Sequence, residues 1–554
     1  MFPTHMKIEL IAFNCRYTHS CLALFYVRNE LEKRLSPCSV SIEQFTINDP
    51  YFETLLRIST SDAEALFFSV YIWNSTYLSR LLADLHAIKP DTPLVLGGPQ
   101  ALALRETLTF SPTVVHHEIE GVDPCFFVDL QKRVLKKDYK GSPVKIFDYP
   151  YKQEDFTSQL KNRNIYYEAS RGCPFYCAYC LSSVSHGVRA KDLSIIKSEI
   201  VEILKLRPSM IRFVDRTFNA DPQKTLDLWK FLQNESDNCL FHFEVAPDLF
   251  TEEMFQFLEG APEGKFQFEI GIQSTNKETL AAVNRKMDVQ KSLATLKRLK
   301  GIGTIHLHVD LILGLPMETE ESFANSIRDV LRTEPHQLQM GLLKVLPATA
   351  IAEKAEYFGI TACQAPPYQV MKTRWMEHKT LSKLYWIGEC IESFYNKGYF
   401  KNFFSFCIKE EIDIYSFFYS LAKECEKHGF FELAKTQKLM NDILYYFINS
   451  HNNNIILTEL LIYDWLMSGH RFIPDVFKID INDHRELIWK LADTEIDGLY
   501  TVNEKNFFFK KGIFFKFSMS VLTLCGYKNI FSDSYVGFFK DDRCSKTEAK
   551  IIPC

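Results

Sequence analysis

Three cysteines inside one short loop constrain this chain more than any other feature of its sequence. Residues 170–180 read Ser-Arg-Gly-Cys-Pro-Phe-Tyr-Cys-Ala-Tyr-Cys, so three residues separate Cys173 from Cys177 and two separate Cys177 from Cys180. A strand-like run precedes the loop, and Gly172 and the proline after the first cysteine interrupt it. We therefore expect the three thiols to surround and bind one common group.

Thiolates at this spacing suit an iron–sulfur cluster or zinc. A four-iron cluster held by three cysteines keeps one iron without a protein ligand, and a substrate or cofactor can bind at that iron. A structural zinc site needs a fourth ligand, and the sequence has no second close pair of cysteines. The loop favours the cluster, with zinc and three unrelated buried cysteines as the alternatives.

The composition describes a globular protein of several domains. The chain has 554 residues, 46% of them hydrophobic and 24% charged, which predicts about three domains. A net charge of −5 gives no broad basic field for nucleic acid or anionic lipid. No apolar run approaches the ~18–20 residues of a membrane span, and residues 1–7 lack the apolar core of a signal peptide. Because the other cysteines are scattered singly, we expect a cytoplasmic protein with free thiols.

The first third of the chain alternates strands with helices, which predicts an open parallel sheet in a domain of residues 1–140. The expected strands cover residues 7–13, 40–45, 66–72 and 94–96, and the expected helices cover residues 22–35 and 79–89. Ligands of such sheets bind beyond the carboxyl ends of the strands. Ser69, Gly97 and Gly98 fall at these ends and are candidate cofactor-binding residues.

The middle of the chain repeats a strand-then-helix pattern about six times from Ile165 to Leu346, which predicts a barrel domain of residues 161–355 after a linker at residues 141–160. After a first strand at residues 165–169, later strands are expected at residues 210–214, 240–245, 265–270, 304–313 and 337–345. Six units are too few for the eight-unit barrel of ~250 residues. We expect a partial (βα)6 barrel whose site residues lie at the carboxyl ends of its strands.

The cysteine loop, with an aromatic residue just before its last cysteine, resembles the signature of the radical S-adenosylmethionine (SAM) superfamily. Residues 308–316, His-Val-Asp-Leu-Ile-Leu-Gly-Leu-Pro, resemble a second family phrase, which lies beside the adenine of SAM. The resemblance implies that Cys173, Cys177 and Cys180 hold a [4Fe-4S] cluster whose open iron binds SAM. In that family, the reduced cluster cleaves SAM to a 5′-deoxyadenosyl radical, which abstracts hydrogen from a substrate.

The same resemblance implies a set of cofactor-binding residues. Asp215 stands where the family contacts the SAM amino group, and a carboxylate suits an ammonium partner; a helix-cap or turn aspartate is the alternative. Glu244 and Gln273 resemble positions near the SAM ribose and carboxylate. Gly314 permits close approach of the backbone to adenine, and Tyr179 belongs to the cysteine loop. No residue is assigned a catalytic role.

Residues 68–74 and 95–100 look like the cobalamin-binding domains that precede many radical SAM modules. The resemblance implies cobalamin as a further cofactor at the first sheet. Such domains often carry Asp-x-His-x-x-Gly, whose histidine ligates cobalt, but Arg16 stands at that place and His19 follows three residues later. A degenerate or structural domain is therefore the alternative to cobalamin binding.

Beyond residue 355 the repeating pattern stops, and residues 356–554 are expected to form a mostly helical domain with a terminal β-hairpin. Helices are expected around residues 381–395, 414–427, 433–449 and 457–467, and the hairpin around residues 507–509 and 513–517. Phe and Tyr at helical spacing predict a packed core. This part resembles the uncharacterised helical tail of some cobalamin-type radical SAM proteins.

Together these features predict an α/β protein with an N-terminal Rossmann-like domain, a central partial barrel and a helical C-terminal domain. The resemblances imply a radical SAM enzyme of the cobalamin-domain class that transfers a methyl group or performs a related radical transformation. Its substrate would be a small molecule or peptide, and its electrons would come from a donor such as flavodoxin or ferredoxin. Two alternatives stay open: a radical SAM enzyme without cobalamin, and a redox or scaffold protein whose cluster only stabilises the fold.

Overall fold

A computed structural model of the chain describes residues 5–183, 187–236, 238–451, 454–479, 512–540 and 547–552. The chain forms two compact units, which comprise Met1–Leu307, Gly314–Glu318 and Leu342–His378 in the first and His308–Leu313, Thr319–Gly341 and Lys379–Cys554 in the second. The fold is of the expected α/β class. Within the described ranges, no helix has both the length and the apolar character needed to cross a membrane.

The first unit opens with a six-stranded sheet in the order β2-β1-β3-β4-β5-β6, all of whose pairs are parallel. Its strands are β1 (Met6–Asn14), β2 (Cys38–Thr46), β3 (Ala65–Ser69), β4 (Leu94–Gly97), β5 (Thr113–His116) and β6 (Asp138–Lys140). The direction of strand addition reverses between β1 and β3, and such switch points are where α/β sheets bind ligands. Ser69 ends β3 at this switch point.

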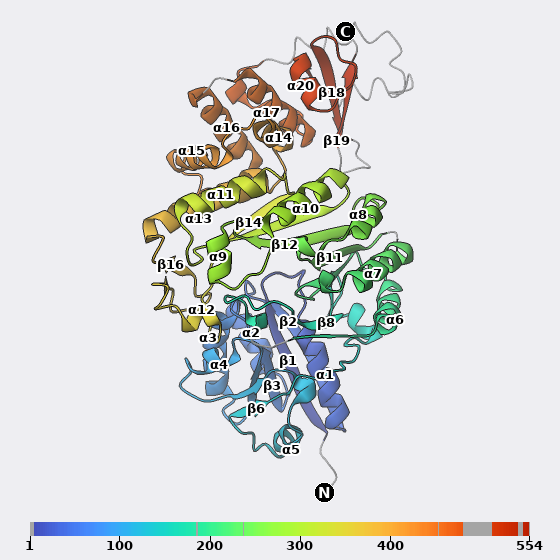
Figure 1. Cartoon of the computed structure of the whole chain (residues 1–554). Coiled ribbons are helices and arrows are strands. Elements are labelled where there is room, and N and C mark those ends of the chain that lie inside the picture. The colour runs from blue at the N-terminus through green and yellow to red at the C-terminus, as the bar shows by residue number, and fades with distance from the viewer. Residues whose placement is uncertain are drawn as a thin grey trace. The chain divides into compact units, whose positions relative to one another are not determined.

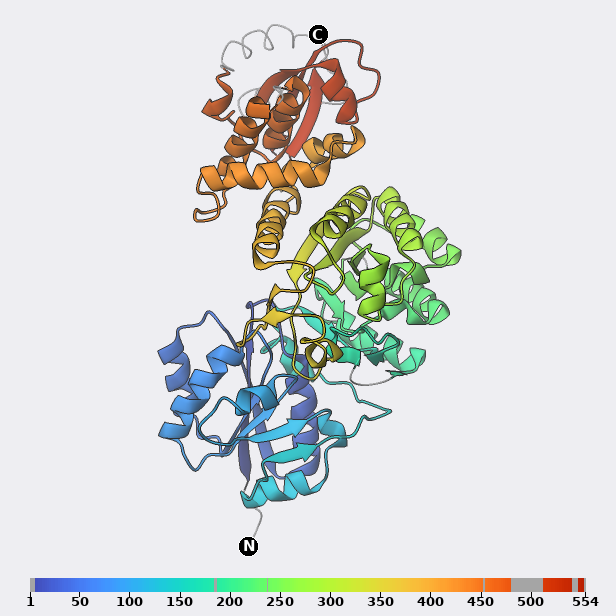
Figure 2. The ribbon, with the colours of Figure 1, turned by 60° about the vertical axis from the view of Figure 1, so that its left-hand side comes forward.

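Helices cover both faces of this sheet (Figures 1 and 2). They are α1 (Leu22–Arg34), α2 (Tyr51–Ser59), α3 (Ser75–Ile88), α4 (Ala101–Arg105) and α5 (Cys125–Lys132). On one face, Phe13, Phe68 and Leu78 belong to a buried cluster with α2 and α3. On the other face, Phe67 contacts Phe126 of α5, with ring centroids 6.3 Å apart. Apolar residues at successive positions of β3 follow from burial on both faces.

A buried ion pair anchors the segment that follows the sheet. Arg28 of α1 donates to both oxygens of Asp155, at 2.5 and 2.8 Å, and to the carbonyl of Pro150 at 3.1 Å. The side chains of Arg28 and Asp155 are only 5% and 3% exposed. Because charges this deeply buried need a partner, the expected linker at residues 141–160 is fixed against α1.

The second sheet has the strand order β14-β13-β12-β11-β10-β7, which confirms the expected partial barrel of six strands. Its strands are β7 (Ile165–Tyr167), β10 (Met210–Phe213), β11 (Leu240–Glu244), β12 (Phe266–Gln273), β13 (His306–Leu313) and β14 (Gln337–Leu342). The helices between and after them are α6 (Leu193–Leu204), α7 (Pro222–Glu235), α8 (Glu252–Glu259), α9 (Lys277–Ala282), α10 (Val289–Ile302) and α11 (Glu320–Leu331). Buried and partly exposed residues alternate along β12, so one face packs and the other stays polar.

The start of the barrel differs from the sequence prediction. The first strand ends at Tyr167, two residues earlier than expected, and Ser170–Cys173 forms a second strand, β8, paired antiparallel with β9 (Gly187–Ala190). Gly172 has φ +94°, and a Cβ on it would lie 2.0 Å from the carbonyl oxygen of Gly187. Gly172 therefore permits a close hairpin rather than ending a strand, and Cys173 is the last residue of β8.

The remaining elements follow the barrel. They are α12 (Ala350–Glu353), β15 (Thr361–Ala362), β16 (Val370–Lys372), α13 (His378–Cys390), α14 (Lys401–Lys409), α15 (Ile414–Lys427), α16 (Gln437–His451), α17 (Ile455–Met467), β17 (Ile513–Phe517), α20 (Met519–Leu524), β18 (Ser534–Lys540) and β19 (Thr547–Ile552). The expected helical character is confirmed. Of the expected hairpin, residues 513–517 form β17, but they pair with β18 in a three-stranded antiparallel sheet. Residues 507–509 lie outside the described residues.

A buried aspartate joins two helices of the second unit. Asp464 of α17 is 3% exposed and accepts hydrogen bonds from the Asn402 side chain at 2.7 Å and the Phe403 backbone at 3.0 Å. These donors lie at the start of α14, where backbone N–H groups have no partner within the helix. Burial raises the pKa of Asp464 to about 7.

A pH titration of stability tests this arrangement. Because the pKa of Asp464 is raised in the folded protein, folding binds its proton more tightly, and its contribution to the free energy of unfolding falls as pH rises from about 4 to about 7. Asp464→Asn removes this titration and keeps one acceptor oxygen. We expect the melting temperature of wild type to fall relative to that of the variant as the pH rises from about 4 to about 7, as measured by calorimetry. A difference that does not change with pH contradicts the shifted pKa.

Candidate cofactor-binding sites

The three predicted cysteines lie at the end of β8 and in the loop that follows it. Cys173 Sγ lies 3.5 Å from the hydroxyl oxygen of Thr217, and the Arg285 guanidinium donates to Cys177 Sγ at 3.7 Å. Hydrogen bonds to cluster sulfurs are one way a protein adjusts a reduction potential. Neither Thr217 nor Arg285 was given a role from the sequence, because no spacing pattern singles out either side chain.

The cysteine loop is held by hydrogen bonds to other segments. The Ala178 N–H donates to the Val283 carbonyl at 2.9 Å, and the Ile351 N–H donates to the Ala178 carbonyl at 2.9 Å. The Asn284 side chain donates to the carbonyl of Tyr176 at 2.9 Å. These hydrogen bonds connect the loop to residues 283–284 and to Ile351.

Three thiols within one loop are a donor set that suits an iron–sulfur cluster. Across the part of the chain that the structure describes, no three His, Cys, Asp or Glu side chains are grouped to hold one metal ion. A four-iron cluster takes one thiolate per iron, so its ligands need not meet at a single point. Burial raises the pKa of the Tyr179 hydroxyl, next to Cys177 and Arg285, so this side chain is neutral in the loop.

Asp215 contacts the residues that lead into β8 of the cysteine hairpin. It follows β10, is 3% exposed, and accepts hydrogen bonds from the Ala169 N–H at 3.0 Å and the Ser170 hydroxyl at 2.5 Å. Burial raises the pKa of Asp215 to about 7. Each carboxylate oxygen thus supports the backbone that leads into β8. The expected contact with the SAM amino group stays a prediction.

Glu244 and Gln273 end the neighbouring strands β11 and β12. The Glu244 side chain is 35% exposed and lies 3.8 Å from the Arg216 guanidinium, and desolvation raises its pKa to about 7. Gln273 has φ +70°, and its buried side-chain oxygen has no hydrogen-bond partner. A Cβ on Gly271 would lie 2.1 Å from the Gln273 amide nitrogen, so the amide folds back over a glycine. Both side chains offer oxygens to a ligand.

Gly314 follows β13 with φ +90°, a conformation that favours glycine. A residue without a Cβ allows a ligand to approach the backbone there. The predicted contact with adenine is not tested by this geometry and stays a prediction.

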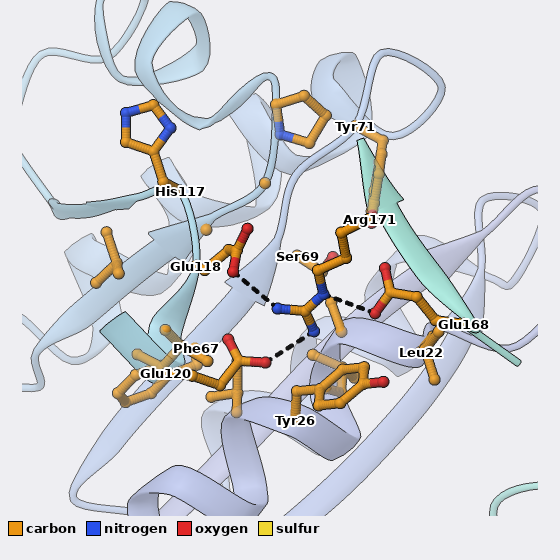
Figure 3. A pocket seen from close by; sticks show the side chains of 18 of the residues that line it. Leu22, Tyr26, Phe67, Ser69, Tyr71, His117, Glu118, Glu120, Glu168 and Arg171 are labelled. Carbon is orange, nitrogen blue, oxygen red and sulfur yellow. Dashed lines mark hydrogen bonds and ion pairs between the residues drawn. The ribbon is translucent and has the colours of Figure 1, made fainter. Parts of the chain in front are cut away.

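A second site is a cavity of about 560 Å³ at the carboxyl ends of the first sheet (Figure 3). All three residues predicted there, Ser69, Gly97 and Gly98, line it. Leu22 and Phe67 contribute apolar walls between α1 and the sheet. Other lining residues come from the hairpin strand β8 and from the loop after β5. The cavity thus reaches the strand that carries the first cysteine.

Gly97 and Gly98 differ in what they contribute to the cavity. Gly98 has φ +103°, and a Cβ on it would lie 2.6 Å from the Val70 carbonyl oxygen, so only glycine fits the turn. A Cβ on Gly97 would meet nothing within 4 Å. The absence of a side chain at Gly97 therefore leaves free space beside the strand end. Cys21 donates from its thiol to the Ser69 hydroxyl at 3.2 Å.

Neither Arg16 nor His19 lines the cavity. Arg16 is exposed, and the His19 ring lies 2.5 Å from the Tyr166 hydroxyl, where burial lowers the pKa of the imidazole. His117 is an imidazole that does line the cavity, with φ +63°. His117 and Glu118 were not identified from the sequence, because the strand β5 that precedes them carries few apolar residues.

Fold and site define a class: an α/β protein with a doubly wound domain in front of a partial barrel that carries a three-cysteine cofactor loop. Residues 167–330 match the radical SAM superfamily, and this part of the chain is a radical SAM domain. Proteins of this superfamily use a [4Fe-4S] cluster and SAM. Residues 356–530 match a protein family of unknown function, DUF4080.

Curated relatives share part of the chain. An uncharacterized methyltransferase of Pyrococcus horikoshii is 23% identical over 47% of this chain and 53% of its own length. The tRNA-2-methylthio-N(6)-dimethylallyladenosine synthase of Thermotoga petrophila is 23% identical over 38% of this chain and 50% of its own length. The chain thus spans about half the length of these relatives.

Solved structures share the fold. The radical SAM methyltransferase TsrM of Kitasatospora setae, with tryptophan and a SAM analogue bound, matches with a TM-score of 0.52 at 14% identity, over 66% of this chain and 80% of that one. The cobalamin-dependent SAM radical enzyme OxsB, with aqua-cobalamin bound, matches with a TM-score of 0.57 at 13% identity, over 87% of this chain and 82% of that one.

A substitution at Gly172 tests the hairpin. In Gly172→Ala the new Cβ meets the Gly187 carbonyl at 2.0 Å, in addition to a backbone strain on the order of 1–3 kcal/mol. We expect the variant to take up little iron during reconstitution and to lack absorption near ~400 nm.

Gly301→Ala in α10 is the matched control, because a Cβ there meets nothing within 4 Å. The control should take up as much iron as wild type. Equal iron contents in the two variants would contradict the role assigned to the hairpin.

Proposed function

We propose that this protein is a radical SAM enzyme that reductively cleaves SAM and uses cobalamin to transfer a methyl group to a carbon atom of its substrate. The observation that carries the proposal is the shared strand β8. Ser170 to Gly172 line the cavity of the first domain, and Cys173 follows directly in the cysteine loop. One strand thus serves both candidate cofactor sites.

Cys173, Cys177 and Cys180 are the proposed cluster ligands. When bound there, the cluster supplies the electron that breaks a carbon–sulfur bond of SAM. Glu244 offers an accessible carboxylate to the polar groups of SAM, and Gln273 offers an unpaired acceptor oxygen. Asp215 supports the strand below the loop. These roles, with Tyr179 and Gly314 beside them, belong to the proposal.

The character of the cavity supports cobalamin as its ligand. Its lining combines apolar residues of α1 and of the sheet with the charged side chains of Glu118, Glu120 and Arg171. Cobalamin combines an apolar ring system with a periphery of amide groups, which suits such a surface. TsrM is described as a methyltransferase, and OxsB contains aqua-cobalamin. Both share the fold with this chain.

A radical SAM enzyme also needs a reductant and a substrate. We propose a cytoplasmic protein that takes electrons from a flavodoxin or ferredoxin and acts on a small molecule or peptide. Its proposed domains are residues 1–140, 161–355 and 356–554, with a linker at residues 141–160.

SAM cleavage tests the enzymatic part of the proposal. Reconstituted protein with dithionite and SAM should release 5′-deoxyadenosine, measured by chromatography. Cys177→Ala should abolish both this release and the absorption near ~400 nm, because one iron loses its thiolate. Cys38→Ser, in β2 and outside the loop, is the control and should retain both. An intact cluster without SAM turnover would favour a redox or scaffold protein.

A cavity-filling substitution tests the cobalamin part. Gly97→Leu directs a side chain into the free space beside the strand end, so it should lower the affinity for aquacobalamin, measured by equilibrium dialysis. A loss on the order of ten-fold corresponds to about 1.4 kcal/mol.

Iron content and SAM cleavage of the Gly97→Leu variant serve as the control and should match wild type. If wild type binds no aquacobalamin but cleaves SAM, the protein is a cobalamin-independent radical SAM enzyme. The placement of Arg16 and His19 away from the cavity keeps this second candidate open.

A further inference from the structure

We infer that Arg171 is a positioning residue that couples the cavity of the first domain to the cysteine loop, so that occupation of one site changes the binding properties of the other. The inference rests on the proposed function, because it takes the cavity and the loop as the two cofactor sites. It adds a residue and a physical connection between them.

Arg171 binds three carboxylates at once (Figure 3). Its Nε donates to Glu168 at 2.8 Å, one terminal nitrogen donates to Glu118 at 3.0 Å, and the other donates to Glu120 at 2.8 Å. The Arg171 side chain is 11% exposed. Every nitrogen of the guanidinium is engaged, and its planar geometry fixes the directions of all three contacts.

The three carboxylates come from two separate stretches of chain. Glu168 follows β7, whereas Glu118 and Glu120 lie around the short helix Ile119–Gly121 after β5. All three carboxylates line the cavity with Arg171. Arg171 itself lies in β8, two residues before Cys173. One side chain therefore connects the cavity wall to the strand of the first cluster ligand.

Glu118 also binds Arg189, which lies in β9, the other strand of the hairpin. Arg189 of β9 donates to Glu118 at 3.0 Å, and the Val144 N–H donates to the same carboxylate at 3.0 Å. Burial disfavours its charge, but these hydrogen bonds hold the pKa of Glu118 below its usual range. Both strands of the hairpin are thus bound to the residue that opens the cavity loop.

The surroundings leave Arg171 little freedom to move alone. Its guanidinium lies 4.8 Å from the ring centroid of Tyr26 and 4.3 Å from that of Phe147. Moving it away would leave three partly desolvated carboxylates without their shared cation, which is strongly unfavourable. A ligand that shifts the loop around Glu118 and Glu120 therefore shifts Arg171 with it. The displacement reaches Cys173 through two peptide units of β8.

The test compares aquacobalamin affinity in two states of the protein, cluster-loaded and iron-free. In wild type we expect the two affinities to differ on the order of five-fold or more. Arg171→Lys keeps the positive charge, but its single ammonium replaces a planar guanidinium whose three nitrogens each donate to a different carboxylate. The affinity ratio should fall to about one in this variant, measured on preparations of both proteins that carry the same amount of iron.

The matched control is Arg57→Lys in α2, since Arg57 forms a more exposed pair with Glu43 in the same domain. This control should keep the wild-type affinity ratio. An Arg171→Lys protein that also keeps the wild-type ratio, or a wild-type ratio of one, overturns the inference and leaves the proposed function standing.

A second measurement needs no cobalamin. Hydrogen exchange of the segment 170–180 should be faster in Glu120→Gln than in wild type, although residue 120 is far from this segment in sequence. The control Glu43→Gln should leave the exchange unchanged. Should Arg171→Lys not fold, this pair of variants still decides the matter.

If wild type binds no aquacobalamin, the cobalamin part of the proposed function fails, and the exchange measurement alone tests Arg171. Unchanged exchange in Glu120→Gln then overturns the inference. Faster exchange in this variant supports a connection from the cavity wall to the cysteine loop, whatever ligand the cavity binds.

Discussion

The close approach of two backbones at Gly172 and Gly187 is the constraint on which both candidate sites depend. No side chain fits between Gly172 and the facing carbonyl of Gly187, so the paired strands β8 and β9 approach each other closely at this point. This hairpin ends in Cys173 on one side and presents Ser170 and Arg171 to the cavity on the other. A loop that merely followed β7 would present the cysteine without also lining the cavity.

Buried carboxylates support the functional parts of the molecule. Burial raises the pKa values of Asp215 and Asp464 to about 7, yet each carboxylate accepts hydrogen bonds that order a neighbouring segment. For Asp215 that segment leads into the cysteine hairpin. Arg171 shows the opposite solution, in which three carboxylates share one guanidinium and part of a second, Arg189. In both arrangements a buried charged or polar group has hydrogen-bond partners, and these hydrogen bonds order the neighbouring backbone.

Much of the fold could be predicted from the sequence because long elements carry a clear period. Phe266 to Gln273 alternates strictly, and Ile414 to Lys427 repeats at helical spacing, so β12 and α15 were both found. The strands β5 and β8 were missed because they carry few apolar residues, whereas β4, which has the same length, was found from its apolar run Leu94 to Leu96. β8 also depends on a positive φ at Gly172, which a sequence pattern presents only as a break.

Among the residues of the candidate sites, some follow from a sequence pattern and others do not. The cysteines follow from their spacing, and Ser69, Gly97 and Gly98 follow from the rule that ligands bind at strand ends. No pattern in the sequence assigns a role to Thr217, Arg285 or Glu118, and only the fold brings them to the sites. Asp215 was found, but its hydrogen bonds to Ala169 and Ser170 depend on a hairpin that the sequence did not reveal.

The ion pair between Arg28 and Asp155 has a consequence for the order in which the chain assembles during synthesis. All six strands of the first sheet have been made once Lys140 has left the ribosome, but the partner of Arg28 follows later. Until then Arg28 lacks both the carboxylate and the Pro150 carbonyl that bind its guanidinium in the complete structure. The nascent first domain can therefore form its sheet before α1 has all of its contacts. Residues 150–155, which lead into the barrel, then complete the domain that precedes them.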